Sequence, residues 1–227
     1  MEQDGDFFRR TRRAWLQRAL LGGTAMPLLL RDAFAANKRP NRMVEIRGEV
    51  LINGRPAKAG AALRSGDSVA TAGRSSAMFV AGADAFLLRE KSELLTAGGG
   101  ILTASLRLVT GKLLSVFGRG SRGITTPTGT IGIRGTGVYI EAEAVCTYVC
   151  TCYGVVDLQA ANAPEARETV STTHHDAQRC IYGHGEKRIR MIETAPVTNH
   201  TDAELTALEA LVGRKPPFAG PGTEFKR

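Results

Sequence analysis

Residues 124–139 read ITTPTGTIGIRGTGVY, and this stretch decides the fold class. It sets four glycines and one proline among β-branched residues, a composition typical of strands interrupted by turns and bends. The apolar positions change parity inside the stretch, because Ile131 and Ile133 are odd-numbered whereas Val138 and Ile140 are even-numbered. Side chains alternate across a strand with period two, so one face of a sheet can hold both pairs only if the strand is broken between them.

The break falls within residues 134–137. A β-bulge or tight corner there would re-aim the strand, and glycine accepts the positive φ that such a corner needs. We therefore take Arg134, Gly135 and Thr136 as a structural corner. Arg134 would stand at this corner in solvent or paired with a carboxylate, rather than as a ligand-binding residue.

Short β-type runs separated by turn residues fill most of the chain from residue 43 onward. The turn signals include Asn53-Gly54, Ser65-Gly66-Asp67 and the three glycines at 98–100. Such spacing predicts an all-β fold, a sandwich or roll of many short, mainly antiparallel strands. Asn53-Gly54 predicts a two-residue hairpin turn, and residues 98–100 predict a hairpin tip.

One short helix is expected near the C-terminus, over residues 203–212. Thr201 with Glu204 three residues later forms a capping box, and the leucines that follow recur at helical spacing. Gly213 ends the helix, and the two prolines shortly after it forbid its continuation.

A resemblance accompanies this pattern. Thr126-Pro127, followed by the Arg134-Gly135-Thr136 corner and a further strand, resembles the end of a FecR-like domain. An early Gly66-Asp67 pair with Thr71 shortly after it also fits that family, and the similar region covers residues 46–159. The family is β-rich, exported and best known for relaying ligand signals from outer-membrane receptors to sigma factors. The resemblance implies a non-catalytic binding or interaction module with an envelope protein as its partner.

Residues 1–35 resemble a twin-arginine signal peptide. Arg12 and Arg13 precede a short, mild apolar run, and Ala33-Phe34-Ala35 is a small-x-small cleavage pattern, so cleavage after Ala35 is expected. The apolar run is too short and broken for a membrane helix, which needs about 20 apolar residues. We expect a periplasmic protein with no stable membrane span after cleavage. The alternative is an uncleaved N-terminal segment that anchors the protein in the inner membrane.

Composition divides the rest of the chain into a linker at 36–42, the FecR-like β domain at 43–160 and a C-terminal extension at 161–227. The extension holds a Cys/His-rich loop and the short helix. Lys and Arg outnumber Asp and Glu by 30 to 22 over the whole chain. No basic run is interleaved with aromatic residues, so we expect no nucleic-acid partner.

Three of the four cysteines fall in the sequence CTYVCTC, at 146, 150 and 152. If this stretch is an extended strand, all three thiols share one face. The Cα atoms of Cys150 and Cys152 would then lie about 6.6 Å apart, from the rise per residue of a strand. That separation is near the upper limit for a disulfide, whereas two thiolates could still converge on one ion.

Three of the four histidines fall within residues 174–184, together with the last cysteine. Thiolates and imidazoles are the ligands that zinc and copper(I) prefer. The candidate metal ligands are therefore Cys150, Cys152, His174, His175 and Cys180. Without a metal, the cysteines would instead form disulfides, with Cys180 paired to one of the three in the strand. The fourth histidine, His200, is expected simply to belong to the start of the helix.

Three classes of function remain open. The favoured class is the non-catalytic periplasmic interaction module, the second is a periplasmic metal-binding protein and the third is a thiol-dependent envelope enzyme. Catalysis is not expected, because no motif places a nucleophile, a base and an orienting group in register. Metal content and a count of free thiols would separate the first two classes.

Overall fold

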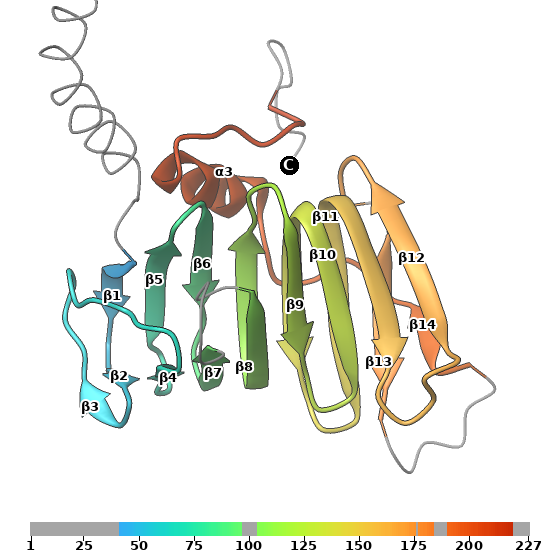
Figure 1. Ribbon diagram of the computed structural model, residues 1–227, viewed down its shortest axis with the longest axis horizontal. Coiled ribbons are helices and arrows are strands. Elements are labelled where there is room, and N and C mark those ends of the chain that lie inside the picture. Colours follow the sequence, from blue (N-terminus) through green and yellow to red (C-terminus); the bar gives the residue numbers. More distant parts are fainter. Residues whose placement is uncertain (1–40, 97–103, 176, 184–189, 220–227) are drawn as a thin grey trace, which may run out of the picture. The chain divides into compact units, whose positions relative to one another are not determined.

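The computed structural model describes residues 41–96, 104–175, 177–183 and 190–219 (Figure 1). All of them belong to a compact unit that spans residues 39–227. The expected signal peptide and the expected glycine tip at 98–100 lie outside the described residues. Among the residues that are described, no helix has both the length and the apolar character needed to cross a membrane.

The all-β prediction is confirmed. Fourteen strands of the described chain form one sheet, antiparallel except where β8 meets β9, and one short helix follows them (Figure 1). The elements are β1 (Arg42–Arg47), β2 (Val50–Ile52), β3 (Arg55–Pro56), β4 (Ser68–Thr71), β5 (Ser76–Ala81), β6 (Asp84–Leu88), β7 (Ser92–Thr96), β8 (Ser105–Val116), β9 (Ser121–Thr125), β10 (Gly129–Ala142), β11 (Cys146–Ala160), β12 (Arg167–Thr172), β13 (Gln178–Tyr182), β14 (Ile192–Thr194) and α3 (Asp202–Leu211).

The three longest strands change partners midway along their length. The first half of β10 pairs with β9 and its second half with β8, while β11 pairs with β13 at one end and β12 at the other. Each of these strands contains a glycine with positive φ between its two halves, namely Gly111 in β8, Gly135 in β10 and Gly154 in β11. Glycine accepts this backbone conformation without the clash of a Cβ atom, so these positions let long strands turn from one set of neighbours to the other.

The corner in β10 lies where the sequence changes parity. The register against β11 shifts between Arg134 and Gly137, and Gly135 has a φ of +58°. The hydroxyl of Thr136 accepts a hydrogen bond from the backbone N–H of Val155 at 3.1 Å. Arg134 is two-thirds exposed and pairs with Asp157 at 2.6 Å. The shift allows the odd-numbered Ile131 and the even-numbered Ile140 of β10 to enter the same core.

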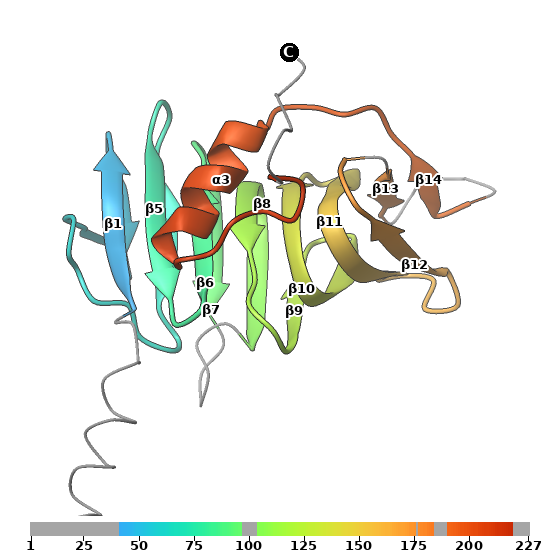
Figure 2. The same cartoon turned by 90° about the horizontal axis from the view of Figure 1, so that it is seen from above.

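Two apolar clusters hold the fold together. The larger one is enclosed by the sheet and consists mainly of Val, Leu, Ile and Phe. The smaller one lies under α3, which packs on the face formed by β6 and β8 (Figure 2). Leu205 and Leu208 of α3 are fully buried there against Leu114, Tyr139 and the two cysteines at 150 and 152. The helix therefore serves as a cover for this part of the sheet.

The local turn and helix predictions are confirmed. Asn53 and Gly54 form the turn between β2 and β3 with φ values of +52° and +74°. Thr201 and Glu204 form a reciprocal capping box at the start of α3. Gly213 follows the helix with a φ of +67°. These features depend on residues close in sequence, which is why the pattern alone specifies them.

The segment after residue 160 continues the same sheet. Strand β12 pairs with one end of β11, and β13 pairs with the other. The Cys/His-rich stretch that we expected to be a loop is therefore partly strand, because Cys180 lies within β13. His174 and His175 lie in the connection between β12 and β13.

Candidate metal site

Two thiols of β11 lie close together beside a β-bulge. Gly137 of β10 pairs with Tyr153 and Val138 pairs with Thr151, so Cys152 is the extra residue between them. The sulfurs of Cys150 and Cys152 lie within 4.8 Å of each other, and both residues are fully buried. A regular strand would hold these side chains parallel and apart, whereas a bulge re-aims one of them.

The same bulge anchors the first histidine. The carbonyl oxygen of Cys152 accepts a hydrogen bond from the backbone N–H of His175 at 3.0 Å. His175 has a φ of +47°, which is uncommon for a residue other than glycine. Its carbonyl accepts the side-chain amide of Gln178, the first residue of β13. The ring is thereby placed with Nδ1 at 3.5 Å from the sulfur of Cys150.

The second histidine comes from the segment that leads into α3. His200 Nε2 lies 2.9 Å from His175 Nδ1, and its ring stacks on Tyr139 with a centroid separation of 4.6 Å. The preceding residue, Asn199, has a φ of +59°. Arg89 holds this segment by donating to the carbonyl oxygen of Asn199 at 2.8 Å. His200 was expected only at the start of the helix, and its part in this cluster could not be predicted from the sequence, since only the docking of α3 brings it there.

The protonation of both rings follows from their outer partners. His200 Nδ1 lies 2.6 Å from the carbonyl oxygen of Thr198, which can only accept, so this nitrogen carries the hydrogen. His175 Nε2 lies 2.9 Å from a carboxylate oxygen of Asp202 and is assigned the hydrogen for the same reason. In neutral rings, the lone pairs of His175 Nδ1 and His200 Nε2 then face each other and the two thiols. Two lone pairs in contact repel each other unless a proton or a metal ion lies between them.

Four ligand atoms therefore converge at one point. The sulfurs of Cys150 and Cys152 and one nitrogen each of His175 and His200 all lie within 4.8 Å of one another. Each imidazole donates its other N–H to an oxygen outside the set, the arrangement by which proteins orient histidines that bind metals. We call these four residues the inner set.

The thiols of the inner set differ in acidity. A hydrogen bond from Cys152 lowers the pKa of Cys150 well below its ordinary value, with help from His175 and His200 and against the effect of burial. Burial and the neighbouring Cys150 raise the pKa of Cys152. For His175, burial is the largest single influence and lowers the pKa. The combined effect of Cys150 and Asp202 is larger and opposite, so the pKa of His175 is raised. The lowered pKa of Cys150 favours its thiolate form, and thiolate is the form that binds metals.

The same contacts could suggest a thiol nucleophile. Cys150 contacts His175, and His175 contacts Asp202, which is the order of a nucleophile, a base and an orienting carboxylate. However, the sulfur of Cys150 is fully buried under α3, where no substrate can reach it. His200 Nε2 also occupies the space beside His175 Nδ1, through which a base would transfer its proton. The geometry favours coordination over nucleophilic attack.

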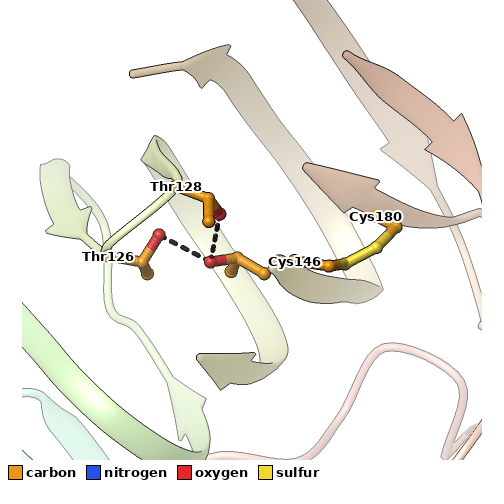
Figure 3. The surroundings of a disulfide bond; sticks show 5 residues. Thr126, Thr128, Cys146 and Cys180 are labelled. Carbon is orange, nitrogen blue, oxygen red and sulfur yellow. Dashed lines mark hydrogen bonds between the residues drawn. A yellow bond between two sulfur atoms is a disulfide. The ribbon is translucent and has the colours of Figure 1, made fainter. Parts of the chain in front are cut away.

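Cys180 is not part of the site. Its sulfur is bonded to that of Cys146, with a Cα–Cα distance of 5.9 Å, and the disulfide joins β13 to β11 (Figure 3). Including Cys180 among the metal ligands was therefore wrong, because the pairing of β13 with β11 places it opposite Tyr148, next to Cys146 rather than Cys152. His174 also lies outside the inner set, and its ring nitrogen meets Asp202 instead. Cys150 and Cys152 remain free.

No known protein family matches this chain. None of the curated proteins matches it either. The fold is similar to two crystal structures, at 1.65 Å and 2.50 Å resolution, of a candidate anti-sigma factor from Parabacteroides distasonis. In both comparisons the sequence identity is 10%, the TM-score is 0.46, and the match covers 56% of this chain and 58% of the other. This chain thus spans little more than half the length of those proteins.

Proposed function

We propose that this protein is a non-catalytic, exported metal-binding module of the FecR-like β type. In this proposal Cys150, Cys152, His175 and His200 hold one ion, and the protein acts through an envelope protein partner rather than by turnover. The observation that supports metal binding is the convergence of four soft ligand atoms whose rings are oriented from outside. The resemblance at the Arg134-Gly135-Thr136 corner supports the placement among exported interaction modules.

The ligand set favours zinc or copper(I). Bond lengths of about 2.0 Å to nitrogen and 2.3 Å to sulfur imply ligand separations of roughly 3.3–3.8 Å around a tetrahedral zinc ion. The observed 3.5 Å from Cys150 to His175 matches this range, and the 2.9 Å between the histidines would open slightly. Calcium and magnesium prefer oxygen ligands. A two-iron cluster would hold cysteines and histidines on different irons, whereas here all four ligand atoms are mutual neighbours.

A set of four protein ligands also supports a role without catalysis. Zinc enzymes keep one position open for water or substrate, while sites that only stabilise or bind are closed by the protein. The inner set is of the closed type and is buried on the side of the thiols. We therefore propose that the ion stabilises the folded module, and that gain or loss of the ion changes the form of the module that an envelope partner meets.

Elemental analysis combined with thiol counting tests this proposal. Wild-type protein recovered from the cell envelope without chelators is expected to contain one zinc or copper ion per chain and two thiols that react after denaturation. Cys152→Ser is expected to lose the ion, because the remaining three ligands leave the site open to exchange. The double variant Cys146→Ser, Cys180→Ser is the matched control, since it removes two cysteines outside the inner set and should keep the ion. Wild-type protein with no metal and no free thiols would refute the site.

The export part of the proposal has its own test. Replacing Arg12 and Arg13 by lysine is expected to leave precursor in the cytoplasm, because the twin-arginine route depends on that pair. The measurement is fractionation followed by detection of precursor and mature forms. A control with lysine at Arg9 and Arg10, which lie outside the pair, should be exported normally. Periplasmic accumulation of the Arg12, Arg13 variant would show that another route, or an uncleaved anchor, is used.

A further inference from the structure

The two ring nitrogens of His175 face two different groups of ligand atoms. Nδ1 faces the inner set, at 3.5 Å from Cys150 and 2.9 Å from His200. Nε2 faces the opposite way and lies 2.9 Å from Asp202. The carboxylate of Asp202 in turn meets His174 Nε2, with both oxygens at 3.0 Å. His175 is thus shared by the inner set and by a second group that it forms with His174 and Asp202.

Exposure decreases step by step along this series. The side chain of His174 is 47% exposed, that of Asp202 is 21% exposed and that of His175 is 15% exposed. The two cysteines at the inner end are fully buried. An ion from solvent cannot meet the thiolates first, whereas His174 and Asp202 offer it a nitrogen and a carboxylate at the surface.

We propose that His174 and Asp202 form an outer loading position, through which a divalent cation of the zinc type reaches the inner set past His175. The inference rests on the proposed metal site and adds a second, transient position to it. The ion would first be held by the imidazole of His174 and the carboxylate of Asp202. It would then move to the nitrogen and sulfur ligands of the inner set, while the ring of His175 remains between the two positions.

The geometry and chemistry of the outer position fit this role. Nitrogen and oxygen ligands of one cation lie roughly 3 Å apart, so the spacing between His174 and Asp202 needs little change to admit an ion. The carboxylate attracts a cation. A set without thiolates binds soft ions more weakly than the inner set does, so transfer inward is favourable.

Both residues of the outer position are held in place by neighbouring elements. Asp202 is the first residue of α3, whose capping box and buried leucines fix the start of the helix. The ring of His174 packs on Phe218, with 4.5 Å between centroids. A simpler role for Asp202 would be only to orient His175, which leaves no kinetic role for His174. The two roles can be separated by measuring rates as well as affinities.

Stopped-flow loading of the metal-free protein with Co²⁺ tests the proposal, with thiolate-to-cobalt absorption as the signal. Zn²⁺ competition against a chelator supplies the dissociation constant. His174→Gln is expected to slow metal loading and metal release by the same factor, on the order of tenfold. This magnitude is the lower end of the range by which local charge alters association rates. The dissociation constant should stay within about twofold of the wild-type value. A residue that contacts the ion only in transit changes the energy barrier to loading, and leaves the free energies of the metal-free and metal-bound protein unchanged. Thr173→Ala, an exposed neighbour without a ligand atom of this kind, is the matched control and should load like wild type.

Asp202→Asn separates loading from orientation. It is expected to slow loading and also to weaken the equilibrium affinity about 10–100-fold, since Asp202 contacts His175 as well as His174. Loading of His174→Gln at the wild-type rate would overturn the outer position while leaving the inner set intact. A weaker affinity of His174→Gln with an unchanged loading rate would also overturn it, by making His174 an equilibrium ligand. Absence of any uptake by wild-type protein would overturn the metal site itself and the loading position with it.

Discussion

Removing the ion with a chelator is expected to lower the melting temperature of the wild-type protein by roughly 10 °C. An ion that binds only the folded chain stabilises it by about 4 kcal/mol when its free concentration is a thousand times the dissociation constant. Each kcal/mol corresponds to roughly 2–4 °C in a protein of this size. The proposed ligands come from β11, from the β12–β13 connection and from the segment before α3, so the ion would join parts of the chain that are distant in sequence.

The metal-free protein should nevertheless remain folded. Leu205 and Leu208 are fully buried under α3, and burial of such a side chain stabilises a fold by about 1.5–3 kcal/mol. The disulfide between Cys146 and Cys180 joins β11 to β13 without the ion. Chelation should therefore shift the unfolding transition and not abolish it, which calorimetry with and without chelator would measure.

Variants distinguish the ion from the disulfide as the source of stability. Cys152→Ser is expected to melt near the temperature of the chelated wild type and to show no further response to chelator. The double variant Cys146→Ser, Cys180→Ser should keep its response to chelator and lose its response to reductant. If reductant lowers the melting temperature of the wild type while chelator leaves it unchanged, the stability of this region comes from the disulfide alone.

Replacing Gly111 by alanine is expected to destabilise the fold by about 2–5 kcal/mol, the sum of about 1–2 for left-handed backbone and about 1–3 for overpacking. Gly111 has a φ of +93°, and a Cβ atom there would lie 2.5 Å from the Cα atom of Ser92. Ser92 cannot move away easily, because its hydroxyl accepts the amide of Lys112 at 2.8 Å and its own amide donates to Thr71 at 3.0 Å. Denaturant unfolding followed by circular dichroism measures the loss.

Gly135→Ala is the matched control for this substitution. Gly135 also has a positive φ, of +58°, but no atom lies within 4 Å of the place a Cβ atom would take. Gly135→Ala should therefore lower the free energy of unfolding only by the contribution of the left-handed backbone, about 1–2 kcal/mol. Equal losses at the two glycines would show that the contact with Ser92 relaxes freely and that the corner in β8 is not tightly packed.

The sequence identified the parts of this protein that depend on near neighbours. The parity change around Arg134 predicts a corner in β10, and the structure has a bulge there. The capping box of Thr201 and Glu204 predicts the start of the helix, which is confirmed. In both cases the deciding interactions lie within a few residues, so period and turn chemistry are sufficient.

The candidate site could be predicted only in part. The spacing of Cys150 and Cys152 placed two thiols on one face, and His175 was recognised as a soft ligand close behind them. The structure brings these three together. The strand geometry assumed for the cysteines was too regular, since the bulge at Cys152 changes the direction of its side chain. Cys180 was placed in the wrong group because its position depends on which residue of β11 it faces.

What the sequence determined by itself is therefore the all-β class, the glycine corner of β10, the capped helix and the presence of soft ligands in the second half of the chain. Only the tertiary structure decided that Cys180 bonds to Cys146 and that His200 joins the inner set. Those outcomes depend on the pairing of β13 with β11 and on the packing of α3 over the sheet. Both are contacts between residues far apart in the chain, and they are selected by burial of whole faces rather than by local spacing.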